Sequence, residues 1–220
     1  MFKLMKSTIF KNILSTVISL SIVSASMPLQ SSAHEHDYLS GTYTGSINAS
    51  CLMFRIESSA QTSLLTNEVY QAAFDWNNIS SYVGTIGIAM YAPGMPSTGF
   101  FFVYGKSFSD GTLGETVPRD ASGNIVVANS NWRTVSINMN NSSSAFSGAT
   151  NRTAAAKKTF IHEVGHALKL AHPIQNSQLS GHIYNGYPFS VMNQGYPNGY
   201  EVSSSVTNHD CRCLEAKWGA

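Results

Sequence analysis

The stretch HEVGHALKLAH, residues 162–172, places three of the seven histidines of this 220-residue chain within eleven positions. His162 and His166 are four residues apart, so on a helix both imidazoles lie on one face, one turn apart, and can bind one metal ion. Glu163 lies beside them, within reach of a water bound to that metal. With His172, the stretch offers three neutral imidazoles and leaves one position open, which is typical of a catalytic zinc site rather than a closed structural one.

The residues before this stretch predict the helix that carries it. Asn151 can cap a helix that runs through Ala154 to about Leu168.

The residues of the motif suggest a hydrolytic reaction. Zinc lowers the pKa of its bound water toward 7, Glu163 takes the proton, and the hydroxide attacks a polarised carbonyl. The motif therefore predicts a zinc-dependent hydrolase.

The same stretch resembles HExxHxxGxxH, the zinc motif of the metzincin proteases, and residues 190–193 (SVMN) resemble their Met-turn. Three further segments resemble the first strand, the first helix and the closing helix of one metzincin family, the matrixins, at residues 52–57, 73–77 and 206–219. The resemblance covers most of residues 51–219. It implies a zinc endopeptidase with an α+β catalytic domain: a mixed twisted sheet, an active-site helix, a Met-turn and a C-terminal helix.

The resemblance also implies a role for each residue that matches a functional position of the family. The zinc ligands and the general base would be His162, His166, His172 and Glu163. Met192 would form an apolar floor beneath the metal. Tyr196 would line the specificity pocket or contact the transition state, with Tyr187 and Tyr200 as nearby rivals for this role.

One position departs from the family pattern. In the family, a glycine ends the helix so that the third ligand can turn back to the metal. In this chain, Lys169 occupies that position. If this position needs a left-handed backbone, a residue other than glycine costs roughly 1–2 kcal/mol. The cysteine-switch pro-peptide of the family is not recognisable either.

The composition excludes several other classes of protein. Charged residues make up 11% of the chain, against roughly 25% in an ordinary soluble domain, and 32 Ser, 17 Asn and 15 Thr supply polar surface instead. A formal net charge of +1 without a basic run argues against a nucleic-acid partner. The aromatic content of 11% is too high for a disordered chain, and the length fits one domain.

The first 33 residues have the features of a secretory signal peptide. Three lysines precede an apolar run of about 13 residues, which is short of the roughly 20 that a membrane-spanning helix needs. Cleavage after Ala25 or Ala33 fits the small residues there. We expect residues 34–48 to be a leader or short pro-segment and residues 49–220 to be the catalytic domain. The sequence thus predicts a secreted monomer, without a membrane anchor, that acts on peptide or protein substrates.

Hydrophobic periodicity predicts one α+β domain. A helix is expected over about 64–80, with a cap near Thr66, and another after Ser205 or Thr207. Residues 107–124 are expected to form a long loop. The expected strands lie near residues 51–56, 86–91, 100–104, 125–128 and 135–139. Of these, 125–128 is the best candidate for an edge strand that pairs with an extended substrate, the alternative being a plain strand of the sheet.

Export permits disulfide bonds, and the chain has three cysteines. We expect Cys51 to pair with either Cys211 or Cys213, which would link the two ends of the domain. Structural calcium has candidate positions at Asp110 and at residues 120–124, although no complete calcium loop is present.

Two alternative functions stay open from the sequence. A zincin outside the metzincins would use a carboxylate such as Glu201 as third ligand. A secreted binding or adhesion module would keep the fold with little turnover, which the Ser-, Asn- and Gly-rich loops and Lys169 would suit.

Overall fold

The computed structural model describes residues 38–44, 52–79, 87–91, 100–172, 183–184, 187–188, 190–192 and 205–219. All of these residues belong to the unit His36–Ala220. The expected signal peptide lies outside them, as do Cys51, Tyr196 and Glu201. In the part of the chain that is described, no helix combines the length and the apolar character that crossing a bilayer requires.

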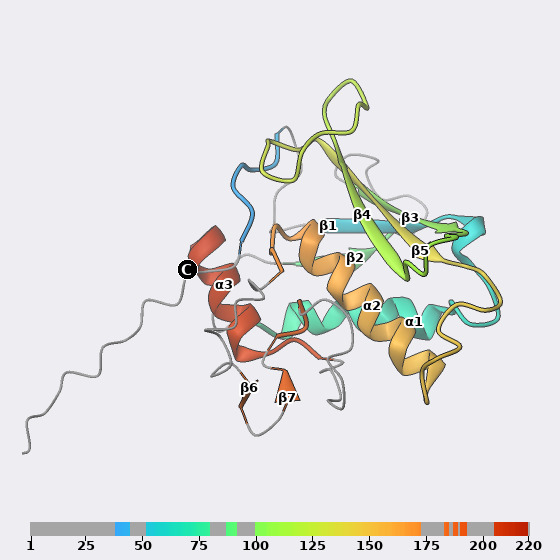
Figure 1. Ribbon diagram of the computed structural model, residues 1–220. Coiled ribbons are helices and arrows are strands. Elements are labelled where there is room, and N and C mark those ends of the chain that lie inside the picture. Colours follow the sequence, from blue (N-terminus) through green and yellow to red (C-terminus); the bar gives the residue numbers. More distant parts are fainter. Residues whose placement is uncertain are drawn as a thin grey trace, which may run out of the picture. The chain divides into compact units, whose positions relative to one another are not determined.

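A five-stranded mixed sheet forms one layer of the fold, with the strand order β2-β1-β3-β5-β4 (Figure 1). Neighbouring strands are parallel except for β4, which runs antiparallel to β5 at one edge. A separate pair, β6 and β7, is antiparallel. The strands are β1 Leu52–Ile56, β2 Ile88–Met90, β3 Phe100–Lys106, β4 Gly114–Arg119, β5 Thr134–Asn140, β6 Ile183–Tyr184 and β7 Tyr187–Pro188.

Of the helices, α1, η2 and α2 pack together, and η2 and α2 lie against the sheet (Figure 1). Their bounds are η1 Ser58–Ala60, α1 Asn67–Gln71, η2 Ala72–Ile79, α2 Arg152–Ala167 and α3 Asn208–Trp218. The helix expected over 64–80 is therefore a short α-helix that tightens into a 3₁₀-helix. The α+β class predicted from the sequence is confirmed.

Side-chain caps begin the two helices that matter most for the site. The side chain of Asn151 accepts a hydrogen bond from the backbone N–H of Ala154, as predicted for α2. At α3 the N-cap is Thr207, which forms a reciprocal capping box with Asp210. Both caps satisfy backbone N–H groups that have no partner within the helix.

Aromatic side chains fix α2 against the sheet and against η2. Phe160 of α2 contacts Phe54 of β1 and Tyr70 of α1, each in an edge-to-face arrangement. Trp76 of η2 is fully buried, and its indole N–H donates to the carbonyl of Ile161 at 3.1 Å. The helix that carries the histidines is thus held on two sides by buried side chains.

The edge of the sheet differs from the sequence prediction. Residues 125–128 do not form a strand: Ile125 makes a single bridge with Arg119, and Ile125 and Val127 are 68% and 74% exposed. The edge strand is β4, which lies within the stretch expected to be a loop. It contains Gly114 and Pro118, which have low strand propensity, and proline is tolerated there because an edge strand needs no second row of hydrogen bonds.

Among the residues that the structure describes there is no disulfide, and the expected pairing with Cys51 stays a prediction. Cys211 and Cys213 are both free, buried thiols on α3, whereas Cys51 lies outside the described residues. Burial raises the pKa of Cys211 to about 11, so this thiol is unreactive near neutral pH. Both cysteines pack into the core as small apolar side chains.

Residues 38–44, expected to belong to a leader, pack against two distant parts of the chain. Tyr38 forms an antiparallel bridge with Leu170, and Tyr43 forms a parallel bridge with Trp132. We call residues 38–44 the strap. Whether residues 34–48 act as a pro-segment stays a prediction.

Candidate metal centre

Three imidazoles converge at the C-terminal half of α2. The Nε2 atom of His162 lies 3.1 Å from that of His166, and the Nε2 atom of His172 lies 3.0 and 2.9 Å from these two. The one-turn spacing predicted from the sequence brings the first two together, and the turn after α2 brings in the third. In the described part of the chain, these three histidines form the one group of three or more candidate ligands that could hold a metal ion.

Backbone carbonyls fix the orientation of two of these rings. The Nδ1 atom of His162 lies 2.9 Å from the carbonyl oxygen of Val191, and that of His166 lies 2.9 Å from the carbonyl oxygen of Leu170. A carbonyl oxygen can only accept, so in both neutral rings Nδ1 carries the hydrogen and Nε2 presents a lone pair. The lone pairs of His162 and His166 therefore meet with no hydrogen between them.

The residues present fit a zinc ion. Two nitrogen ligands, each about 2.0–2.1 Å from a tetrahedral zinc, lie about 3.3 Å apart, close to the 2.9–3.1 Å separations seen here. Burial lowers the pKa of His162 well below its ordinary value, and it lowers the pKa of His166 to about 4. Burial also lowers the pKa of His172. All three rings are thus neutral at neutral pH, as a metal ligand must be.

The turn after α2 has the hydrogen bonds of a Schellman motif. The N–H of Lys169 donates to His166 O and the N–H of Leu170 donates to Gly165 O, both at 2.9 Å. The φ angle of Lys169 is 75°, so this lysine takes the left-handed backbone that usually belongs to glycine. The chain then reverses and carries His172 back to the helix. The left-handed conformation considered for Lys169 from the sequence is present.

Glu163 lies beside the histidines in a buried position and lines the same cavity. The hydroxyl of Thr116 donates to Glu163 Oε2 at 2.7 Å and also to the Glu163 carbonyl at 2.9 Å. Burial raises the pKa of Glu163 to about 7, while the bond from Thr116 opposes this shift. A carboxylate with a pKa near neutrality suits proton transfer at neutral pH.

Gly114 allows β4 to approach α2 at this point. A Cβ atom added to Gly114 would lie 2.9 Å from Glu163 Cγ and 2.8 Å from Thr159 Cγ2. These separations are too short for carbon atoms, so only glycine fits without a shift of the carboxylate. Gly114 therefore lets Thr116, on the same strand, reach Glu163.

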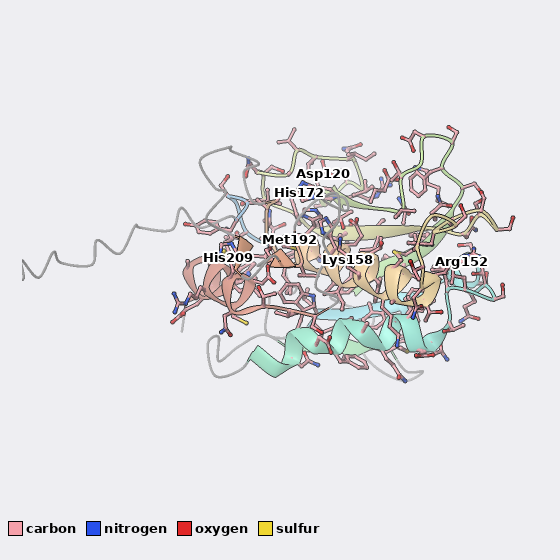
Figure 2. All side chains as sticks on the ribbon, turned by 60° about the horizontal axis from the view of Figure 1, so that its bottom comes forward. Asp120, Arg152, Lys158, His172, Met192 and His209 are labelled. Carbon is pink, nitrogen blue, oxygen red and sulfur yellow. The ribbon has the colours of Figure 1, made fainter. Side chains whose placement is uncertain are left out.

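Met192 is buried and packs against α2 at Gly165. A Cβ atom on Gly165 would lie 2.3 Å from Met192 Sδ, so the glycine within the motif makes room for the methionine. Figure 2 shows Arg152 at the opposite end of α2 from His172 and Met192. The role of Met192 as a floor beneath a metal stays a prediction, as does that of Tyr196.

Asp210 connects α3 to the segment that contains Met192. Its carboxylate accepts hydrogen bonds from Ser190 Oγ at 2.6 Å and from the Val191 N–H at 3.1 Å, in addition to those from Thr207. Val191 in turn supplies the carbonyl that orients His162. The cap of α3 thus supports one of the three imidazoles through a single residue.

A cavity of about 620 Å³ opens onto these groups. One wall is β4, at the edge of the sheet, and another is α2. Lys158 lines the cavity one turn before His162, and Leu39 of the strap lines it as well. An extended chain could therefore lie along β4 with one of its carbonyls next to Glu163.

Sequence reasoning did not identify Thr116, Gly114 or Asp210. The first two lie in a stretch without strand-like periodicity, whereas Asp210 has the spacing of a capping box three residues after Thr207. The two positions considered for calcium hold their carboxylates within their own loops. Asp110 accepts from the Thr112 N–H, and Asp120 accepts from the N–H groups of Ser122 and Asn124.

Neither the models of known protein families nor the curated proteins give a match to this sequence. The resemblance to metzincins therefore depends on the residues of this chain alone.

Proposed function

We propose that this protein is a secreted zinc endopeptidase of the metzincin type, most similar to the matrixins. It would hydrolyse peptide bonds through a metal-activated water, with Glu163 as general base. The observation that carries the proposal is the convergence of three neutral imidazoles within 3.1 Å of one another, next to a buried carboxylate. Two of these imidazoles direct unprotonated nitrogens at the same point, an arrangement that a cation stabilises.

Each side chain of the centre has a defined task in this reaction. His162, His166 and His172 would hold the zinc, which when bound lowers the pKa of water to about 7 and polarises a carbonyl. Glu163 would accept the proton of the attacking water and pass it to the leaving amine. Thr116 holds the Glu163 carboxylate in place through its hydroxyl.

Strand β4 is the element that best fits an extended substrate. It is the last strand at one edge of the sheet, and it lines the cavity. Among the described residues, its outer edge makes only the single bridge between Arg119 and Ile125, so the rest of that edge can pair with a substrate. Backbone pairing along such an edge binds a peptide with little dependence on its side chains. This assignment replaces residues 125–128, which do not form a strand.

The proposal is tested with Glu163→Gln in the full chain, assayed on an unfolded casein-like protein and on peptide libraries. We expect the wild type to cleave both in a chelator-sensitive manner and the variant to lose about 10²–10⁴-fold in kcat, with its bound zinc unchanged. Glu68→Gln is the matched control, because Glu68 is exposed and pairs with Lys157 at the surface. This control should keep full activity.

A wild-type protein with stoichiometric zinc and no hydrolysis of any library would overturn the proposal in favour of a binding or adhesion module. The third ligand is tested by metal content: His172→Ala should lose zinc, whereas Glu201→Gln should keep it. The reverse result would place the protein among zincins with a carboxylate ligand. N-terminal sequencing of the exported protein tests secretion and locates the cleavage site.

A further inference from the structure

The ammonium group of Lys169 is enclosed by backbone oxygens and by an indole ring. The Lys169 side chain is fully buried, and its Nζ atom lies 2.8 Å from Ser130 O, 3.3 Å from Ser40 O and 3.4 Å from Ala128 O. The same atom lies 3.4 Å from the centroid of the Trp132 ring. Three acceptors match the three donors of an ammonium, and the ring face adds a cation–π contact.

These partners come from two segments that are far apart in the sequence. Ser40 belongs to the strap, whereas Ala128 and Ser130 belong to the loop of residues 128–132. The backbone of Lys169 contacts the strap as well, because the Leu39 N–H donates to Lys169 O at 2.7 Å. Lys169 is therefore the point at which the strap, the loop and the turn after α2 meet.

Further contacts hold residues 41–44 of the strap. Tyr43 Oη donates to the carbonyl of Ala167, the last residue of α2, and the Tyr43 ring stacks on Trp218 of α3. Lys217 Nζ donates to Gly41 O at 2.6 Å. Strap and loop are also joined directly, since the Thr44 N–H donates to Trp132 O and the Trp132 N–H donates to Thr42 O.

The place of these contacts links them to the metal centre. Lys169 lies between His166 and His172, in the turn that brings the third imidazole back to α2, and its left-handed backbone is strained for a residue other than glycine. A buried ammonium with satisfied hydrogen bonds can hold such a backbone in place, which an unsupported lysine cannot do. Leu39, next to Ser40, already lines the cavity.

We propose that Lys169 is a positioning residue that clamps the strap and the 128–132 loop onto the turn carrying His172, so that full metal affinity requires residues 38–44. The strap is then an integral part of the mature protein rather than a pro-segment that is removed. This inference rests on the proposed function for the identity of the metal.

The experiment compares two variants of the full chain: one removes the amino group of Lys169, and the other displaces the strap that this group contacts. Lys169→Met removes the ammonium and keeps the length of the side chain. Gly41→Ala leaves Lys169 intact but displaces the strap, because its Cβ would lie 2.3 Å from Ser130 O and its φ angle is +75°. Gly123→Ala is the matched control, with a φ angle of +82° and nothing within 4 Å of the added Cβ.

Two readouts are measured, hydrogen exchange of the strap amides and the affinity for Zn²⁺ alone, in competition with a chromogenic chelator. We expect faster exchange over residues 38–44 and a loss of zinc affinity of about tenfold or more in both clamp variants. Gly123→Ala should match the wild type. Gly105→Ala, whose Cβ would lie 1.9 Å from Ser59 O, controls for a general loss of stability and should leave strap exchange slow under native conditions.

Zinc affinity within twofold of the wild type in a variant with a loosened strap would overturn the inference. Unchanged strap exchange in Lys169→Met would overturn it as well. If Lys169→Met does not fold, Gly41→Ala decides alone. A wild type that binds no zinc would defeat the proposed function instead, and strap exchange in Lys169→Met would still show whether the clamp exists.

Discussion

At the scale of single residues, the placement of the Glu163 carboxylate, the proposed general base, depends on the absence of a side chain at Gly114. Thr116 can reach Glu163 Oε2 because Gly114, two residues earlier on β4, lets the strand approach α2. The glycine is therefore a steric requirement of the site, although it carries no chemistry itself. An added methyl group would have to move either Thr159 or the Glu163 carboxylate.

Gly114→Ala should consequently lower kcat on a peptide substrate by about tenfold or more, because small displacements of a catalytic group are costly. Bound zinc should be unchanged, since the atoms nearest to the added Cβ belong to Thr159 and Glu163 and not to the imidazoles. Gly148→Ala, where nothing lies within 4 Å of the added Cβ, is the control. A kcat equal to that of the wild type would show that the carboxylate tolerates the shift.

At the scale of elements, α3 supports the cluster of three histidines through its capping box. The buried carboxylate of Asp210 accepts hydrogen bonds from Ser190 and Val191 as well as from Thr207. Burial raises the pKa of Asp210, and these hydrogen bonds oppose the shift. The N-terminus of α3 and the turn around Met192 are therefore stabilised by one group.

Asp210→Asn should reduce the free energy of unfolding by about 2–3 kcal/mol, because an amide NH₂ cannot accept from these donors. Denaturation in urea measures this loss, with Asn151→Ala, the cap of α2, as a comparison expected to cost about 1 kcal/mol. Equal losses in the two variants would mean that Asp210 acts only as a helix cap.

The elements also show how far sequence patterns reach. The helix α2, its cap at Asn151 and the first two imidazoles follow from spacing within one element, and all were predicted. Strand β4 was not predicted because its glycine and proline have low strand propensity. Residues 125–128 were wrongly predicted to be a strand because they are apolar, although Ile125 and Val127 are exposed in the structure. Local composition does not show which segment the sheet will pair with at its edge.

At the scale of the whole molecule, several buried ionisable groups make stability depend on pH, and Lys158 is one whose contribution can be isolated. Lys158 is 7% exposed, and burial lowers its pKa from 10.5 to about 8. Between these two values the unfolded chain binds more protons than the folded one, so the free energy of unfolding rises with pH. Below pH 8 both states are protonated, and the cost of burying the charge is fully present.

Lys158→Met should therefore gain stability relative to the wild type below pH 8, and this gain should shrink as the pH rises toward 10.5. Urea denaturation of the metal-free proteins at several pH values measures the difference between the two. Lys157→Met, which removes a neighbouring charge at the surface, controls for net charge. A constant difference across the range would contradict the prediction.

The surroundings of Lys169 were also beyond prediction from the sequence. The departure from the family's glycine was visible, as was the left-handed backbone that it would need. The three carbonyls that enclose its amino group come from residues 39, 41 and 129 positions away in the chain. No periodicity or spacing encodes contacts of that range, so only the folded structure reveals what supports the turn.

The strap has a consequence for the order in which the molecule assembles. Its contacts with Lys169 and Lys217 join residues 129 and 176 positions apart, so the first cannot form before Lys169 has been synthesised, and the second cannot form before Lys217. Closing loops of this length is entropically costly and slow. The strap is made early but is thus among the last parts of the domain to dock, so the turn that carries His172 gains this support late in folding.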